Sequence, residues 1–171
     1  MKNLLVLDQM KLRTLKKIHR SNFYENIYLS KKTKTLVLLA YTLQKGILKR
    51  KITENLYLYA YPTPFRFKGL FLDFLKTIVE VPKLLLFIHQ IIKSHQINYI
   101  RAQGVVIWGL LAYIVNKLWH IPFTVYLIGD EIGVLMKKYR VKIPKVIKHI
   151  IQAFYYKVLS SADNVATNIT S

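Results

Sequence analysis

Two short turns in the C-terminal half combine charged side chains with glycine, directly after two apolar segments. The residues concerned are Arg101, Gln103 and Gly104 after the first segment, and Gly129, Asp130 and Glu131 after the second. A guanidinium can hold a phosphate through two parallel hydrogen bonds, and carboxylates accept hydrogen bonds from hydroxyl groups. A glycine lets a ligand approach the backbone closely. The two turns are therefore a candidate binding site for a phosphorylated, hydroxyl-rich molecule.

Each of these charged residues also has a purely structural interpretation. Asp130 and Glu131 could cap a helix and complement its dipole in the first turn. Arg101 could be the ion-pair partner of either acid. The sequence leaves both interpretations open.

Short apolar segments alternate with longer segments of helical period along the whole chain. Strands are predicted over residues 2–8, 35–41, 55–61, 97–102, 123–128 and 164–169, and helices over 10–28, 65–95, 105–119 and 146–160. Pro82 is expected to kink or split the helix over 65–95. This alternation predicts an α/β fold, a Rossmann-like doubly wound and mostly parallel sheet of about six strands, in one domain over residues 1–171.

The predicted topology brings the two charged turns together. Ligands of an open parallel sheet lie beyond the carboxyl ends of its strands. Strands joined by one right-handed crossover helix usually lie side by side, so the turns after residues 102 and 128 should be about 5 to 10 Å apart. Tyr57, Tyr59 and Tyr61 alternate along another strand. They are either a stacking platform for sugars or one face of an ordinary strand.

Composition excludes several kinds of site. The 171 residues include no cysteine, which rules out disulfides, cysteine-based zinc sites and thiol nucleophiles. The five histidines are dispersed along the chain. We therefore expect neither a bound metal nor a cofactor.

The charge is strongly unbalanced, because 27 Lys and Arg against 8 Asp and Glu give a net charge of +19. Such an excess favours a polyanionic partner, although a solvated basic face is the plainer explanation. Basic residues near the predicted helix over 65–95 and in a later basic segment suit an anionic membrane surface, namely Lys68, Lys76, Lys83, Lys137 and Lys138. Nucleic acid is a weaker candidate, because the charges are spread along the chain and no RNA- or DNA-binding motif occurs. Without a signal peptide or a spanning segment, we expect a cytoplasmic protein, peripheral at the inner face of the membrane.

Residues 96–171 resemble the N-terminal domain of family 4 retaining glycosyltransferases, which have the GT-B fold. The resemblance rests on three segments in order: INYIRAQG, VVIWGLLAYIVNKLWHIPFTVYLIGDE and AFYYKVLSSADNVATNITS. It implies that the chain is the half that binds an acceptor, such as a lipid-linked or phosphorylated sugar. The half that binds the nucleotide sugar is not in the sequence. Two features depart from the family: DQMKLRTLK after the first strand has no glycine, and Ile128 stands where many members have histidine.

The resemblance implies an acceptor-binding half in cell-surface polysaccharide or glycolipid synthesis. Such a half is expected to be inactive without a C-terminal half, which a separate donor-binding chain could supply. Whether the chain is an enzyme by itself therefore stays open. The alternatives are a basic peripheral membrane or nucleic-acid-binding protein without catalysis, or a non-functional gene fragment.

Overall fold

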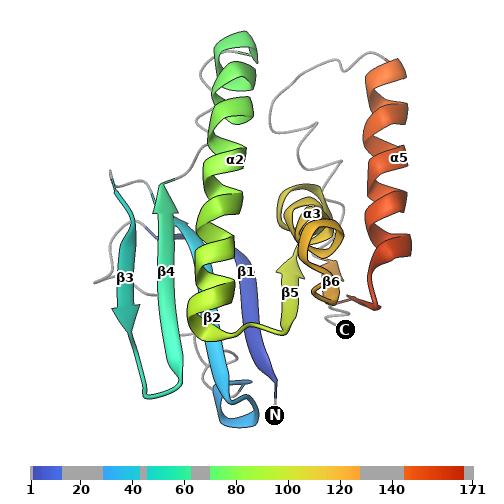
Figure 1. Cartoon of the computed structure of the whole chain (residues 1–171). Helices are drawn as coiled ribbons and strands as arrows, with labels where there is room; N and C mark the ends of the chain where they lie inside the picture. The colour runs from blue at the N-terminus through green and yellow to red at the C-terminus, as the bar shows by residue number, and fades with distance from the viewer. Residues whose placement is uncertain (1, 13–28, 43–45, 63–69, 128–144, 168–171) are drawn as a thin grey trace. The chain divides into compact units, whose positions relative to one another are not determined.

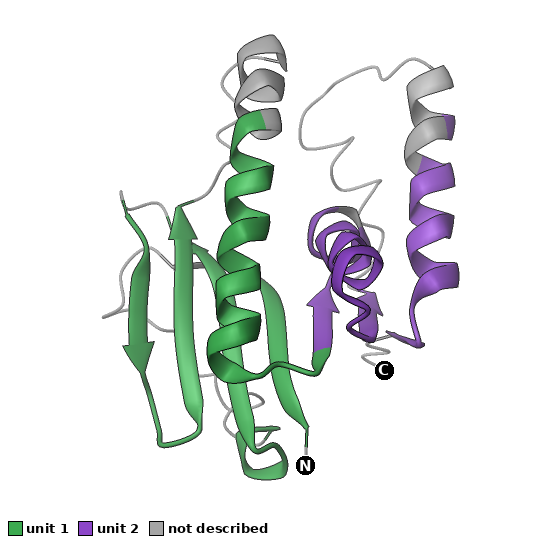
Figure 2. Cartoon of the chain, in the orientation of Figure 1, with its two compact units in different colours: residues 1–99 green, residues 100–171 purple. Residues whose placement is uncertain are grey.

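The computed structural model describes residues 2–12, 29–42, 46–62, 70–127 and 145–167. The chain divides into two compact units, Met1–Tyr99 and Ile100–Ser171 (Figure 2). Both units consist of parallel strands combined with helices. The α/β class and the mostly parallel strand arrangement predicted from the sequence are confirmed, and the assignment of all 171 residues to one domain stays a prediction.

The first unit contains four strands (Figure 1). β1 (Asn3–Leu12), β2 (Thr35–Thr42) and β4 (Leu56–Pro62) run parallel, with β2 between the other two. The short strand β3 (Leu48–Lys51) pairs antiparallel with β4. These strands are almost continuously apolar apart from β3, which is the pattern of a parallel sheet covered on both faces.

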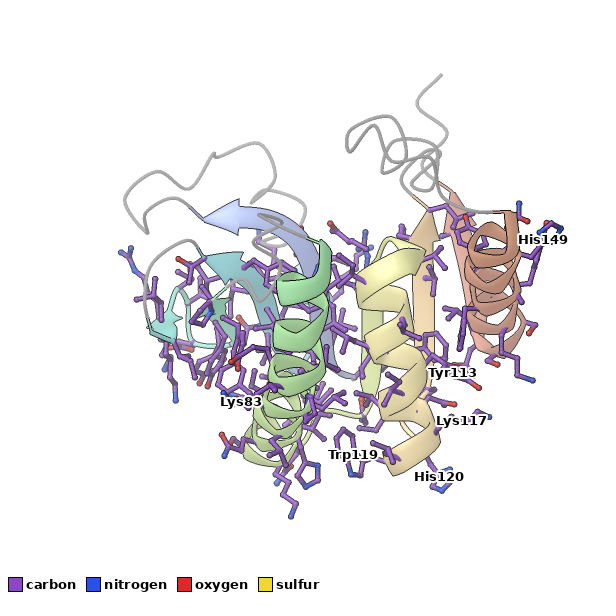
Figure 3. The ribbon with its side chains drawn as sticks, turned by 90° about the horizontal axis from the view of Figure 1, so that it is seen from above. Lys83, Tyr113, Lys117, Trp119, His120 and His149 are labelled. Carbon is purple, nitrogen blue, oxygen red and sulfur yellow. The ribbon has the colours of Figure 1, made fainter. Side chains whose placement is uncertain are left out.

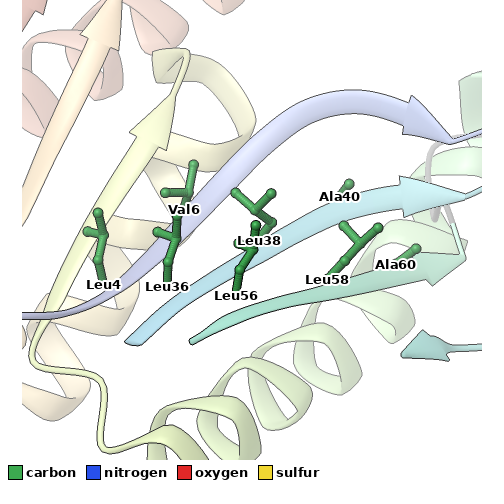
Figure 4. Close-up of a cluster of buried hydrophobic side chains, with 8 residues drawn as sticks. All are labelled: Leu4, Val6, Leu36, Leu38, Ala40, Leu56, Leu58 and Ala60. Atoms are coloured by element: carbon green, nitrogen blue, oxygen red, sulfur yellow. The ribbon is translucent and has the colours of Figure 1, made fainter. Parts of the chain in front are cut away.

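One face of these strands forms a leucine-rich core, which Figure 4 shows at close range. Residues that pair across neighbouring strands contribute to it together: Leu4 of β1 pairs with Leu36 of β2, and Leu36 pairs with Leu56 of β4. The cluster consists of Leu4, Val6, Leu36, Leu38, Ala40, Leu56, Leu58 and Ala60. The alternate residues of β1 and β2 are also fully buried, among them Leu5, Leu7, Val37 and Leu39. Both faces of this sheet are therefore covered.

Helix α2 (Leu70–His95) packs on the second face through its own apolar stripe. Leu84, Ile88 and Ile91 are buried at spacings of four and three residues, as expected for one face of a helix. The Phe87 ring lies 5.9 Å from that of Tyr59 and 5.4 Å from that of Tyr61, centroid to centroid. Tyr59 and Tyr61 are thus buried beneath α2, and the idea that they form a sugar-stacking platform is wrong.

The C-terminal end of α2 is fixed to β4 by a histidine. Tyr59 Oη and His95 Nε2 lie 2.9 Å apart, and the rings of Tyr57 and His95 are 4.5 Å apart. Burial lowers the pKa of His95, and the positive charge of Lys49 lowers it further. Folding therefore favours the neutral form of His95.

The free energy of unfolding should fall as the pH falls below about 6.5, the usual histidine pKa. At such a pH the unfolded chain binds a proton at residue 95 more readily than the folded chain does. The His95→Gln variant should lose part of this dependence. Urea unfolding at pH 7.5 and pH 5.5 would measure it. His120→Gln, at an exposed histidine, is the matched control. An equal pH dependence in wild type and His95→Gln would contradict this assignment.

The second unit is a parallel arrangement of β5 (Tyr99–Gln103), β6 (Phe123–Leu127) and β7 (Asn164–Thr167), with β6 in the middle. A π-helical turn η1 (Val105–Gly109) and helix α3 (Leu110–Trp119) follow β5, and helix α5 (Lys145–Ser161) precedes β7. Asp163 fastens the start of β6, since its carboxylate accepts a hydrogen bond from the Phe123 amide at 2.7 Å. Its own amide donates to the Phe123 carbonyl at 2.9 Å.

Two local predictions differ from the structure. β1 continues to Leu12, because Lys11 and Leu12 still pair with β2 after a register shift, so no helix begins at Met10. Pairing within the sheet outweighs the helical pattern of these residues. Strand β3, with the mostly exposed sequence LKRK, was not predicted, and it raises the number of described strands to seven. At Pro82 a kink or a split was expected, and α2 runs through this residue as one helix, so the split is excluded.

Candidate functional site

The structure describes one of the two charged turns that the sequence singles out. Arg101 and Gln103 lie on β5, and Gly104 follows directly. Gly129, Asp130 and Glu131 lie outside the described residues. The expected convergence of all six residues on one cleft therefore stays a prediction.

Arg101 extends along the strands toward their carboxyl ends. Its Cα pairs with that of Thr124, whereas its guanidinium carbon lies 3.7 Å from the ring centroid of Tyr126, two residues further along β6. The side chain is buried, with 7% of its surface exposed. An arginine keeps its charge in any protein environment, and a face-on aromatic ring stabilises that charge. β5 and β6 thus hold a fixed positive charge beside Tyr126.

The face that carries Arg101 is polar, in contrast to the other face of the same strands. The two cross-strand rows on it are Arg101–Thr124–Asn164 and Gln103–Tyr126–Ala166. The residues that alternate with them, Ala102, Phe123 and Val125, are fully buried and apolar. The Gln103–Tyr126–Ala166 row lies near the carboxyl ends of these parallel strands, where an α/β fold places its ligand.

Thr124, Tyr126 and Asn164 were not among the candidate residues chosen from the sequence. The alternation in FTVYL contained a signal for the first two, because a hydroxyl-bearing side chain occupies every second position. The register that places them beside Arg101 and Gln103 is a tertiary property, and only the structure provides it.

Gly104 has a backbone function. Its φ of 89° and ψ of 152° lie in a region that is essentially restricted to glycine. Its amide donates to the Tyr126 carbonyl at 2.8 Å, and its carbonyl accepts from the Gly109 amide at 2.9 Å. The residue is buried, so it links the end of β5 to the π-helical turn. Single π-helical turns occur frequently at functional sites.

Replacing Gly104 with alanine should lower the free energy of unfolding by about 1 to 3 kcal/mol, because a Cβ is strained at this φ and ψ. Chemical denaturation would measure the loss. Gly46→Ala is the comparison, since Gly46 has a φ of 97° but is exposed, with nothing within 4 Å of the added Cβ. Its surroundings can relax, so it should cost less. Equal costs at both positions would show that Gly104 is not specially constrained.

Of the five lysines proposed for a membrane surface, only the side chain of Lys83 is described. It is exposed on α2, and its ammonium lies 2.9 Å from the Glu80 carboxylate. This hydrogen bond is the main reason that the pKa of Lys83 is raised. Lys68, Lys137 and Lys138 lie outside the described residues, as does the side chain of Lys76. The membrane assignment of these lysines stays a prediction.

Two further observations concern the described part of the chain alone. No helix in it has the length and hydropathy needed to cross a bilayer. Its histidines and acids form no group of three or more that could hold a metal ion.

Among solved structures, the chain is similar to a sucrose-phosphate synthase from Thermosynechococcus elongatus. The TM-score is 0.63 at 9% sequence identity, and the match covers 96% of this chain and 42% of that one. This chain thus spans less than half the length of the synthase. The sequence matches no protein-family model and no curated protein. The structural likeness shows a glycosyltransferase-like, Rossmann-type fold.

Proposed function

We propose that this chain is the acceptor-side half of a GT-B glycosyltransferase of the family 4 type. The observation that carries the proposal is the likeness to the synthase over 96% of this chain but only 42% of that one. A half that binds the nucleotide sugar, on the same polypeptide or on a separate chain, would complete the enzyme. The reaction class is hexosyl transfer, in the synthesis of cell-surface polysaccharide or glycolipid.

The polar face of the second unit supports a phosphorylated sugar as the acceptor. The guanidinium of Arg101 supplies the charge that a phosphate requires. Gln103 and Thr124 bear amide and hydroxyl groups that can pair with sugar hydroxyls, and the Tyr126 ring offers an apolar surface to a pyranose. Gly129, Asp130 and Glu131 follow β6 closely in the sequence, and we assign them to the same acceptor site.

Two sequence features support the assignment of donor binding to another half. No glycine follows Asp8 before residue 46, so the first strand lacks the flexible loop that lets backbone amides surround a phosphate. Ile128 offers no proton and no hydrogen bond where many family members have histidine. Contacts to the nucleotide sugar would then come from the completing half.

The membrane part of the proposal rests on charge. A net charge of +19 attracts the chain to the anionic inner face of a cytoplasmic membrane. A lipid-linked acceptor is displayed at such a surface. We therefore propose a cytoplasmic protein that acts as a peripheral component there.

Vesicle flotation tests the acceptor assignment. The chain is mixed with phosphatidylcholine vesicles that contain a polyprenyl-phosphate-linked hexose, the same polyprenyl phosphate without sugar, or no added lipid. Recovery with the vesicles should be highest for the sugar-bearing lipid, because the phosphate and the hydroxyls are both recognised. Equal recovery with all three preparations would contradict acceptor binding.

A further inference from the structure

The amino-terminal edge of the sheet in the first unit is built as one hydrogen-bonded rim. The start of β1, the segment before β2, the turn before β4 and the end of α2 lie at this edge (Figure 1). The Lys34 amide donates to the Lys2 carbonyl at 3.0 Å, and the Asn98 amide donates to the Asn3 carbonyl at 3.1 Å. The backbone positions of these four segments are therefore fixed relative to one another.

Asparagine side chains fasten the same rim. The Asn3 amide group donates to the Gln96 carbonyl at 3.0 Å, and that of Asn55 donates to the Ser30 carbonyl at 2.6 Å. The Asn3 backbone amide donates to the Asn98 side chain at 3.0 Å. Asn3 is buried, and both its side-chain nitrogen and its backbone amide donate hydrogen bonds within the rim.

This rim carries a dense set of exposed cations. They are Lys2, Lys31, Lys32, Lys34, Lys51 and Lys93, and we name this set the lysine edge. Glu54 is the only acid among the rim residues that the structure describes. Like charges gathered on one rim repel one another, and an anionic surface would reduce that repulsion.

We propose that the lysine edge docks the chain on an anionic lipid surface through charge alone. The large apolar side chains found exposed in the described residues are Ile47, Val79, Leu86, Leu118, Phe154, Tyr156 and Val165. None of them belongs to the rim, so the contact inserts no apolar group into the bilayer. This inference deepens the membrane part of the proposed function and does not depend on the sugar acceptor.

The chemistry of the edge favours lipid over nucleic acid. Lysines act as hydrated point charges, whereas nucleic-acid sites favour the planar, stacking guanidinium of arginine. The set contains six lysines, and one exposed arginine, Arg50, precedes Lys51 on β3. Proteins that hold single strands also present aromatic rings to the bases. Here the ring of Tyr99 is covered by the ammonium of Lys2, 3.8 Å from its centroid.

The test compares two double variants of the full chain that have the same net charge. The edge variant is Lys31→Gln and Lys34→Gln. The control is Lys117→Gln and Lys157→Gln, two exposed lysines that lie off the rim. Lys117, for example, is exposed near the C-terminal end of α3 (Figure 3). Circular dichroism melting confirms that both variants fold.

Co-sedimentation with vesicles of phosphatidylcholine and phosphatidylglycerol measures affinity. The edge variant should bind at least about tenfold more weakly than wild type, and the control should stay within about twofold.

Raising the salt concentration to about 1 M should release wild type completely, because the Debye length shrinks to about 3 Å. Equal losses in both variants, or residual binding at high salt, would overturn the proposal. So would an edge variant that loses affinity for a single-stranded oligonucleotide but not for vesicles. Failure here, with sugar-dependent flotation intact, would leave the acceptor assignment standing.

Discussion

Replacing Leu38 with alanine is expected to lower the free energy of unfolding by about 2 to 5 kcal/mol. Leu38 lies in the middle of β2 with 1% of its surface exposed, among the leucines of β1 and β4. Truncation removes buried apolar surface and leaves a cavity that the flanking strands cannot close. Urea unfolding followed by circular dichroism would measure the loss.

Leu86→Ala is the matched control for Leu38→Ala. It removes the same atoms from α2, where 63% of the Leu86 surface is already exposed to water. Its cost should stay within about 0.5 kcal/mol. If both variants lose the same stability, the leucine-rich face of the first unit does not form the core of the fold.

Replacing Arg101 with leucine should weaken binding of a phosphorylated sugar by about 10- to 100-fold. A hydrogen bond to a charged group contributes about 1.5 to 3 kcal/mol, and 1.4 kcal/mol corresponds to a factor of ten. Circular dichroism melting checks that the variant remains folded. Calorimetric titration with a short-chain polyprenyl-phosphate-linked hexose would give the affinity.

Arg101→Lys separates charge from shape. Lysine keeps the positive charge but loses the planar group that lies 3.7 Å from the Tyr126 ring centroid. Its affinity should fall between those of wild type and Arg101→Leu. Unchanged affinity in Arg101→Leu, together with a large loss of stability, would assign Arg101 a structural role only.

The fold could be predicted largely from local patterns. The strands β2, β4 and β6 are short apolar segments with clear ends, and their observed bounds lie within one residue of the predicted ones. The errors lie where tertiary pairing determines the outcome. Lys11 and Leu12 belong to β1 because β2 is beside them, and β3 is a strand because β4 offers it an edge. Neither partner is visible in the local sequence.

The site could be predicted only in part, for a related reason. Arg101, Gln103 and Gly104 were found because charge and glycine at the end of a strand are local signals. Tyr126 and Thr124 were missed because only the pairing of β5 with β6 places them beside Gln103 and Arg101. Gly104 was selected because a glycine lets a ligand approach the backbone, and the structure adds that it is buried with a φ of 89°. Backbone conformation of this kind has no signature beyond the glycine itself.

Parallel nuclear magnetic resonance titrations of the isotope-labelled chain test the central claim most directly. One series adds the short-chain polyprenyl-phosphate-linked hexose, and the other adds UDP- and GDP-sugars. An acceptor-side half should show saturable shifts in the amide signals of Gln103, Gly104 and Tyr126 with the lipid-linked sugar. It should show none with the nucleotide sugars. Saturable, tight binding of a nucleotide sugar, with no response to the lipid-linked sugar, would contradict the account.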